Sequence, residues 1–164
     1  MPSTYEPIAT TTLGSAASTI TFSSIPASYT DLRLVLLLRS AATQYVTFRL
    51  NGDTGSNYSY TWMDGSGSAV ASGRGTNDSL AYISQRTITN GQNAFFTLDL
   101  FSYAGNTNKT ILTTNNQDEN GSGFVGTQVV LYRNTSAINT INLISGVSIY
   151  GVGTTATLYG IKNA

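Results

Sequence analysis

Hydrophobic and polar residues alternate along much of the chain with the two-residue period of a β-strand. Residues 44–50 are a clear example. Val46, Phe48 and Leu50 would point to one side of a strand there, and the residues between them to the other. A stretch with the 3.6-residue hydrophobic period of a helix is hard to find. The pattern therefore predicts an all-β protein.

Ten segments carry strand signals, and turn-forming Gly, Asn and Asp residues separate many of them. The segment at 32–38 is apolar on both faces, so we expect a central strand that is covered on both sides. So many strands in one domain imply two packed sheets, because a single open sheet would leave one face unburied. The expected strands span residues 19–22, 32–38, 44–50, 58–62, 79–84, 94–101, 110–114, 125–133, 140–150 and 155–161.

The predicted fold class is a jelly-roll-like β-sandwich of two antiparallel sheets, because long strands joined by long loops suit two Greek keys. An immunoglobulin-like sandwich is the second choice. We expect residues 19–164 to form this single domain. Residues 1–18 have sparse apolar side chains, which predicts an extended N-terminal arm that gains order by docking. Residues 63–77 are rich in Gly, Ser and Ala and predict a long mobile surface loop.

The composition excludes several kinds of chemistry. The chain has no histidine and no cysteine, which removes the usual proton carrier near neutral pH and most transition-metal ligands. Eight basic and eight acidic residues cancel, so no net field attracts nucleic acid or anionic lipid. The longest apolar run, 34–38, is too short to span a bilayer, and the first residues lack signal-peptide features. We expect synthesis in a cytoplasm, no membrane insertion and no nucleic-acid partner.

No pair of carboxylates stands out as the two acids of a glycosidase. Most acidic residues lie in expected turns, and the exception, Asp99, is expected to pair with Arg33 or Arg49 on a neighbouring strand. A Ser–Lys pair remains formally open, although Lys109 and Lys162 are the only lysines. We therefore expect a protein that is not an enzyme and holds no cofactor.

Two loops rich in Asn and Asp could present oxygen atoms to calcium. Neither has the spacing of an EF-hand, and side chains that cap the turn backbone explain both loops more simply. We expect no metal site, with calcium binding as an open alternative. The residues concerned are Asn51, Asp53 and Asn57 in one loop, and Asn116, Asp118 and Asn120 in the other.

Three aromatic side chains would share one face of the strand expected at 58–62. We expect them to make a core or subunit contact, and the alternative is a platform on which sugar rings stack. The apolar residues of the expected arm are further candidates for contact with another subunit. The candidate protein-interface residues are Tyr5, Ile8, Leu13, Tyr58, Tyr60 and Trp62.

Both ends of the chain carry distinctive motifs. The opening has TYEPIATTTLGSAASTITFSSIP at 4–26 and YTDL at 29–32, and the ending has GTTATLYGIK at 153–162. Together these motifs resemble the ends of small structural proteins of tailed bacteriophages. The middle of the chain adds nothing to the resemblance.

The resemblance implies a virion component of the β-sandwich type, often trimeric, with no catalytic residues. Such proteins sit on the head as decoration or cement proteins, or in the tail as fibre or adaptor pieces. The chain lacks the heptads and repeats of a long shaft. We therefore predict a capsid decoration protein, a homotrimer that binds the major capsid protein or other virion subunits at the capsid surface. The alternative is a tail fibre, receptor-binding or adaptor module that contacts host surface glycans.

Overall fold

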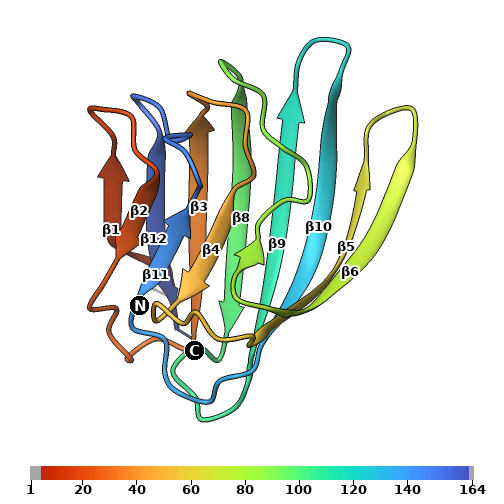
Figure 1. Ribbon diagram of the computed structural model, residues 1–164. Helices are drawn as coiled ribbons and strands as arrows, with labels where there is room; N and C mark the ends of the chain where they lie inside the picture. Colours follow the sequence, from red (N-terminus) through yellow and green to blue (C-terminus); the bar gives the residue numbers. More distant parts are fainter. Residues whose placement is uncertain (1–4, 163–164) are drawn as a thin grey trace.

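The structure, a computed structural model, describes residues 5–162, and these residues form twelve strands and no helix (Figure 1). In chain order the strands are β1 (Tyr5–Thr12), β2 (Thr19–Phe22), β3 (Asp31–Arg39), β4 (Thr47–Leu50), β5 (Tyr58–Gly65), β6 (Val70–Asp78), β7 (Ala81–Tyr82), β8 (Asn93–Phe101), β9 (Lys109–Asp118), β10 (Gly123–Tyr132), β11 (Ile141–Ile144) and β12 (Thr155–Ile161).

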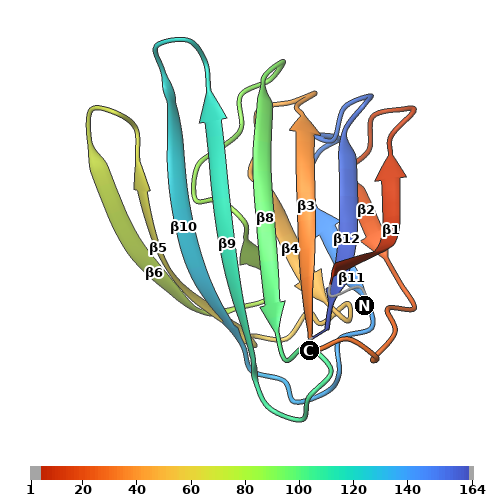
Figure 2. The same ribbon diagram turned by 180° about the vertical axis from the view of Figure 1, so that it is seen from behind.

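The strands build two antiparallel sheets of unequal size. The larger sheet has eight strands in the order β1-β12-β3-β8-β9-β10-β5-β6, and the smaller sheet has four in the order β2-β11-β4-β7. The smaller sheet lies in front of the larger one in Figure 1. The view from behind shows that the other face of the larger sheet has no strand packed on it (Figure 2). The predicted fold class, an all-β, jelly-roll-like sandwich of two antiparallel sheets, is confirmed.

The core lies between the two sheets and follows from the alternation within each strand. Leu32, Leu34 and Leu36 of β3 point inward and are fully buried. Leu37 points to the other face and is 46% exposed. The expectation that this strand is covered on both sides is therefore wrong for the described chain, because the smaller sheet covers one face of β3 only.

The segment expected to be a mobile loop at 63–77 is instead a β-hairpin. Strands β5 and β6 pair along their length, from Tyr58 opposite Asp78 to Gly65 opposite Val70. The prediction of a loop failed because the glycines of this segment make room for side chains of the neighbouring strand and do not mark a flexible chain. A Cβ atom on Gly73 would come within 2.9 Å of the Trp62 ring, so the small residue makes room for the ring on the neighbouring strand.

The expected N-terminal arm belongs to the sandwich from Tyr5 onward. Strand β1 pairs with β12 at the edge of the larger sheet, with Thr12 opposite Thr155. Pro7 is tolerated because an edge strand has one side that needs no backbone donor. The part of the expected arm at residues 1–4 lies outside the described residues.

Other strand limits differ from those expected. The strand expected at 140–150 ends at Ile144, and the strand expected at 79–84 is reduced to two residues. The strand expected at 110–114 instead continues to Asp118. It continues because polar residues of β9 pair with β10 up to the turn between them. Hydrophobic alternation therefore underestimates a strand whose end is polar.

Candidate functional site

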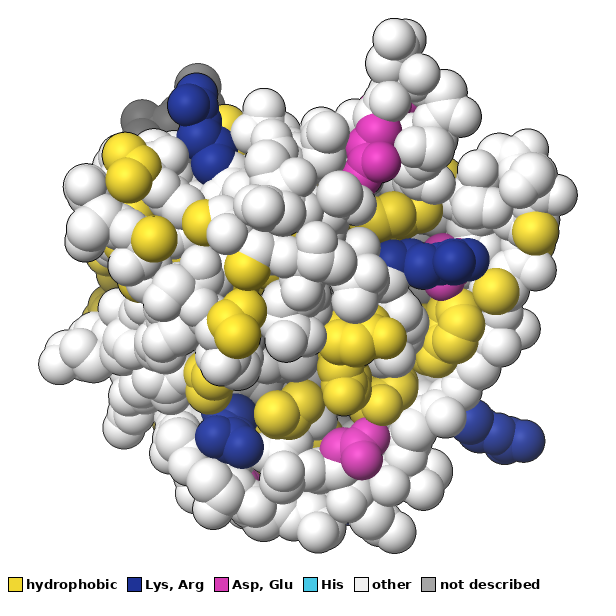
Figure 3. All heavy atoms as spheres, turned by 45° about the horizontal axis from the view of Figure 1, so that its top comes forward, with side chains coloured by type: hydrophobic (Ala, Val, Ile, Leu, Met, Phe, Trp, Pro, Cys, Tyr) yellow, Lys and Arg dark blue, Asp and Glu magenta, His cyan; other side chains and the backbone are white. Residues whose placement is uncertain are grey.

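The smaller sheet leaves part of the inner face of the larger sheet uncovered. Figure 3 shows a hollow between the body of the sandwich and the β5–β6 hairpin on the right. Hydrophobic side chains gather in the hollow, together with a basic and an acidic side chain. We call this hollow, formed by the inner faces of β9, β10, β5 and β6, the concave groove. It is the candidate functional site.

At its lower end the groove merges with the core. Tyr58 is fully buried, and its ring stacks on that of Tyr132 with 4.8 Å between the ring centroids. The Tyr58 hydroxyl accepts a hydrogen bond from the backbone N–H of Leu50 at 2.9 Å. Burial raises the pKa of Tyr58 to about 12. Tyr58 is therefore a neutral core residue and cannot contact a ligand in the groove.

The next two rings of the segment form a wall of the groove. Tyr60 and Trp62 point to the same side of β5 as Tyr58 and are half-buried. Tyr60 meets the ring of Tyr82 edge-on at 5.9 Å, and Tyr82 meets Tyr45 at 5.4 Å. Burial, with a hydrogen bond to a carboxylate, raises the pKa of Tyr60 to about 12. This aromatic wall is therefore uncharged near neutral pH.

An ion pair lies beyond the rings. Asp64 continues the inward face of β5 and is only 5% exposed. Arg86, from the segment between β7 and β8, donates to Asp64 Oδ1 from Nε at 2.9 Å and from Nη2 at 2.6 Å. The hydrogen bond with Asp64 raises the pKa of Arg86. The other carboxylate oxygen, Asp64 Oδ2, has no donor among the described residues.

Polar side chains also occupy the inward positions of β9 beside this ion pair. Asn115 and Gln117 are each 4% exposed, and neither Asn115 Oδ1 nor Gln117 Oε1 has a donor within residues 5–162. Gly126 pairs with both Asp64 and Asn115. A Cβ atom at this glycine would lie 2.9 Å from Asp64 Cβ and 3.0 Å from Asn115 Oδ1. Glycine is required here because the two polar side chains close over its backbone.

Sequence reasoning missed this polar cluster. Its signal was present, because Thr113, Asn115 and Gln117 recur at the two-residue period of a strand. Polar residues at that period suggest a solvent-facing row, and in the structure all three are buried. These three side chains are buried because the larger sheet curves around them and the segment between β7 and β8, which carries Arg86, packs over them.

A pocket of about 420 Å³ lies beside the upper end of the groove. It lies between the tip of the β5–β6 hairpin and the tip of the β9–β10 hairpin. Gly65, Ser66 and Gly67 line it from the first tip, and Gln117 and Phe124 are among the lining residues of the second. The lining also includes the exposed residues Asn116, Asp118 and Val125, and it includes none of Asp64, Asn115 and Arg86.

The expected interface residues of the N-terminal segment lie elsewhere. Tyr5 is on β1, where its ring stacks on Tyr159 at 4.6 Å and is 42% exposed. Ile8 and Leu13 are half-buried and pack against the core. Strands β1 and β5 lie near opposite ends of the larger sheet. The structure thus does not bring the N-terminal residues together with the aromatic segment.

The carboxylate weighed as a catalytic candidate is held in an ion pair. Arg33 donates to Asp99 from Nε at 2.5 Å and from Nη2 at 2.9 Å, so of the two arginines that the sequence left open, Arg33 is the partner. Lys109 is fully buried, and its ammonium group donates to the backbone carbonyls of Gly105 at 2.6 Å and Thr135 at 3.3 Å. Burial lowers the pKa of Lys109. Both side chains therefore hold structure together.

The loops weighed as calcium sites use their carboxylates in turns. Asp53 Oδ1 accepts from the backbone N–H of Gly55 at 2.7 Å, and Asp118 Oδ1 from that of Asn120 at 2.9 Å. In the described part of the chain no group of three or more His, Cys, Asp or Glu side chains could hold a metal ion. Residues 5–162 contain no helix that is long and apolar enough to cross a membrane.

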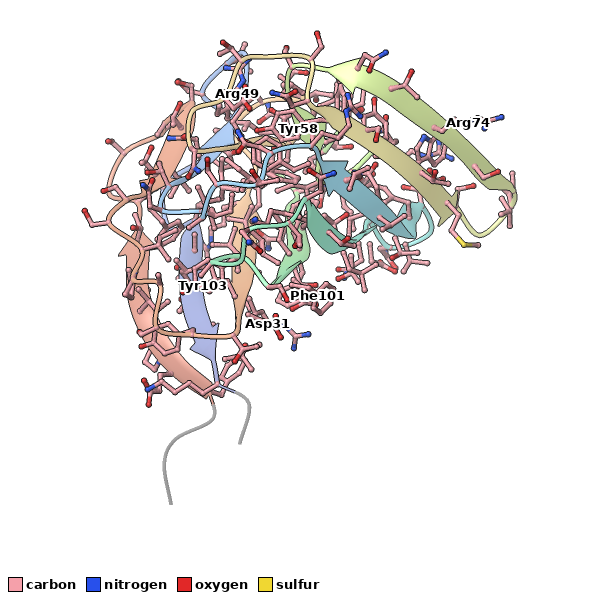
Figure 4. All side chains as sticks on the ribbon, turned by 90° about the horizontal axis from the view of Figure 1, so that it is seen from below. Asp31, Arg49, Tyr58, Arg74, Phe101 and Tyr103 are labelled. Carbon is pink, nitrogen blue, oxygen red and sulfur yellow. The ribbon has the colours of Figure 1, made fainter. Side chains whose placement is uncertain are left out.

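The outer face of the larger sheet carries a strip of exposed apolar side chains. Phe101, Leu112, Val129 and Leu131 are each between 37% and 45% exposed. Leu112 and Val129 are direct partners across β9 and β10, and Phe101 is separated from Leu131 by Thr110 alone. Figure 4 shows Phe101 pointing away from the interior, into which Tyr58 points. We call these four residues the outer apolar strip.

The amino-acid sequence matches no model of a known protein family and no curated protein. Among solved structures the chain is similar to the galectin LEC-6 of Caenorhabditis elegans. The two share 17% sequence identity at a TM-score of 0.37, over 92% of this chain and 95% of that chain.

Proposed function

We propose that the protein is a structural component of a tailed-phage virion, a decoration or cement protein that binds the outer head shell and stabilises it. In this role the protein binds the head shell, and it catalyses no reaction. The observation that supports the proposal is the outer apolar strip, which lies on a broad sheet face that the described chain leaves uncovered.

The physical argument starts from the two faces of the larger sheet. The smaller sheet buries the inner face over β3 and β8, whereas on the outer face Phe101, Leu112 and their neighbours remain in water. Burial against a capsid subunit would remove this apolar area from water, at roughly 25 cal/mol for each Å². Uncharged contacts of this kind are weakly screened by salt. The ion pair beside the strip, Arg33–Asp99, is already formed within the chain.

The homotrimer implied by the phage resemblance stays a prediction. Light scattering coupled to size-exclusion chromatography of the purified protein measures the mass in solution. A mass of three chains of 17.4 kDa each would agree with it. A monomer in solution would restrict trimer formation to the capsid surface.

The proposal is tested on virions of the phage that encodes the chain. Phe101→Lys and Val129→Lys place a charge in the outer apolar strip and leave the core intact. We expect both variants to fold and to occupy heads at roughly a tenth of the wild-type level or less, since each desolvates a charge at the contact. Val152→Lys is the matched control, because Val152 is 62% exposed in the turn before β12.

Two outcomes would contradict the proposal. Equal occupancy of the strip variants and the control would remove the strip from the contact. Immunolabelling of particles gives the second measurement, since a label on the tail would exclude the head position. That result would favour the alternative of a tail fibre, receptor-binding or adaptor module.

A further inference from the structure

We infer that the concave groove is a binding site for a neutral polyhydroxylated ligand, namely the hydroxyl groups of a glycan. This inference goes beyond the proposed role in the virion and does not depend on it. The groove and the outer apolar strip lie on opposite faces of the larger sheet. One protein can therefore use both.

The first step is the set of three unpaired acceptors. Asp64 Oδ2, Asn115 Oδ1 and Gln117 Oε1 lie on buried side chains and have no donor in the described part of the chain. Buried polar atoms are almost always paired, and an unpaired one destabilises a protein. Apolar residues occupy the equivalent inward positions lower on the same strands, such as Ile111 and Val130. The polar cluster therefore works against stability and points to a ligand that supplies donors.

The second step is the charge of that ligand. All three unpaired atoms are oxygens that accept, so an anion would be repelled. A cation is disfavoured because the Arg86 guanidinium already neutralises Asp64 at 2.6 Å. A hydroxyl group donates a hydrogen bond without bringing a charge, and its own oxygen can accept from the guanidinium of Arg86, whose side chain is 40% exposed. A polyol satisfies the cluster where an ion does not.

The third step is the arrangement along the groove. Gln117 pairs with Phe124, Asn115 with Gly126, and the next pair inward is Thr113 with Gln128, beside Trp62. Successive pairs are about 7 Å apart along a strand. Half-buried rings thus alternate with polar groups, and the rings offer apolar faces to the C–H side of a sugar. The 420 Å³ pocket between the hairpin tips adjoins this row of pairs at Gln117 and Phe124.

The three acceptors are shielded from solvent in the free protein. Gln117 lies nearest the hairpin tips and is among the residues that line the pocket there. Asp64 lies one pair further in, under the guanidinium of Arg86. We therefore expect binding to shift the exposed Arg86 side chain away from Asp64, and the guanidinium to contact the ligand.

The experiment begins with the full chain on a printed glycan array. NMR titration of ¹⁵N-labelled protein follows, with D-glucose, D-galactose, D-mannose and N-acetylglucosamine and with the best array hit. We expect shifts of the side-chain amide signals of Asn115 and Gln117 and of the Arg86 Nε signal. Addition of EDTA should leave these shifts unchanged, because no cation takes part.

Two variants separate a binding role from a structural one. Asn115→Leu removes an unpaired acceptor, and the carbonyl of Ile83 that Asn115 contacts still accepts from Thr113 Oγ1 at 3.1 Å. Gln117→Met removes the second acceptor at similar volume, and it also removes the hydrogen bond that Gln117 Nε2 donates to Glu119, whose carboxylate still accepts from Ser122. We expect both variants to unfold at the same or a higher denaturant concentration than wild type, and to bind the best glycan at least about tenfold more weakly.

The aromatic wall needs a separate control. Trp62→Ala should abolish the array signal, whereas Tyr5→Ala, which removes a 42% exposed ring near the far edge of the same sheet, should leave it unchanged. Three results would overturn the inference: no glycan signal at all, shifts that require calcium, or a crystal structure in which ordered water alone pairs the three acceptors. Occupancy of phage heads is measured in a separate experiment. A negative result for glycan binding is therefore distinguishable from a negative result for the proposed virion role.

Discussion

Two fully buried tyrosines differ in what their hydroxyl groups contact. The Tyr58 hydroxyl accepts from the backbone N–H of Leu50, whereas the Tyr150 hydroxyl has no partner among the described residues. Burial raises the pKa of both phenols. The same chemical group therefore stabilises the fold at one position and destabilises it at the other.

This difference predicts opposite effects for one substitution. Tyr150→Phe removes an unpaired polar atom and should leave the free energy of unfolding unchanged or raise it by about 1 kcal/mol. Tyr58→Phe leaves a buried backbone donor unpaired and should lower it by about 1–2 kcal/mol. Urea denaturation of the two variants measures both values. A loss of stability in Tyr150→Phe as large as that in Tyr58→Phe would show that its hydroxyl has a partner.

The Asp53 carboxylate predicts a pH dependence. Partial burial opposes ionisation, but hydrogen bonds from Asn57, Gly55 and Tyr132 outweigh it, and the pKa of Asp53 is lowered. A carboxylate with a lowered pKa stabilises the fold above its unfolded-state pKa, and this contribution is lost as the pH falls through the folded-state pKa. The charged form is the one that holds the turn after β4.

Asp53→Asn should therefore reduce the free energy of unfolding at pH 7 by about 1 kcal/mol. The amide has one acceptor oxygen, which is uncharged, in place of the two charged oxygens of the carboxylate. The difference from wild type should shrink below about pH 3, where the wild-type carboxylate is protonated. Denaturant titrations at both pH values test this. A difference that stays constant with pH would mean that charge plays no part.

At the scale of elements, the β5–β6 hairpin shows how a strand can form from residues that resemble a loop. The glycines of β6 lie beneath the rings of β5, and the space that a Cβ atom would need is already filled. The pairing supplies backbone hydrogen bonds, and the rings supply the apolar cover that the glycines lack. The glycines of β6 are therefore explained by the rings of β5 that pack on them, and not by a propensity of glycine for strands.

Gly75→Ala tests this account. The added methyl group would overlap the Tyr60 ring, so the ring must move and the free energy of unfolding should fall by roughly 1–3 kcal/mol. Ser72→Ala on the outward side of β6 is the control and should change stability little, because Ser72 is exposed. Equal stability of the two variants, measured by thermal unfolding, would show that the hairpin is loosely packed.

The element boundaries show where local pattern suffices. Strand β12 and strand β2 have the limits that alternation predicts, because their neighbours match their pattern of buried and exposed positions. Strand β1 was missed because its apolar residues are sparse and its stability comes from pairing with β12. The partner strand lies at the other end of the chain, so no local window contains the information.

At the scale of the whole molecule, the unequal size of the two sheets creates both candidate surfaces. The smaller sheet covers the inner face over β3 and β8 and leaves the concave groove open over the inner faces of β9, β10, β5 and β6. No strand of the described chain covers the outer face, so the apolar side chains of Leu37 and Phe101 are exposed there. The proposed attachment to a larger assembly uses the outer face, and the proposed ligand binding uses the concave groove.

The sequence by itself determined the all-β class, the inward-facing side of strands such as 19–22 and 44–50, and the choice of Arg33 or Arg49 as the partner of Asp99, because alternation and cross-strand pairing depend on local pattern. Only the tertiary structure decided that residues 63–77 form a hairpin, that β1 closes on β12, and that Asp64, Asn115 and Gln117 meet in one buried cluster. These features depend on which strands become neighbours and how the sheet curves. Both are set by contacts between residues far apart in the chain.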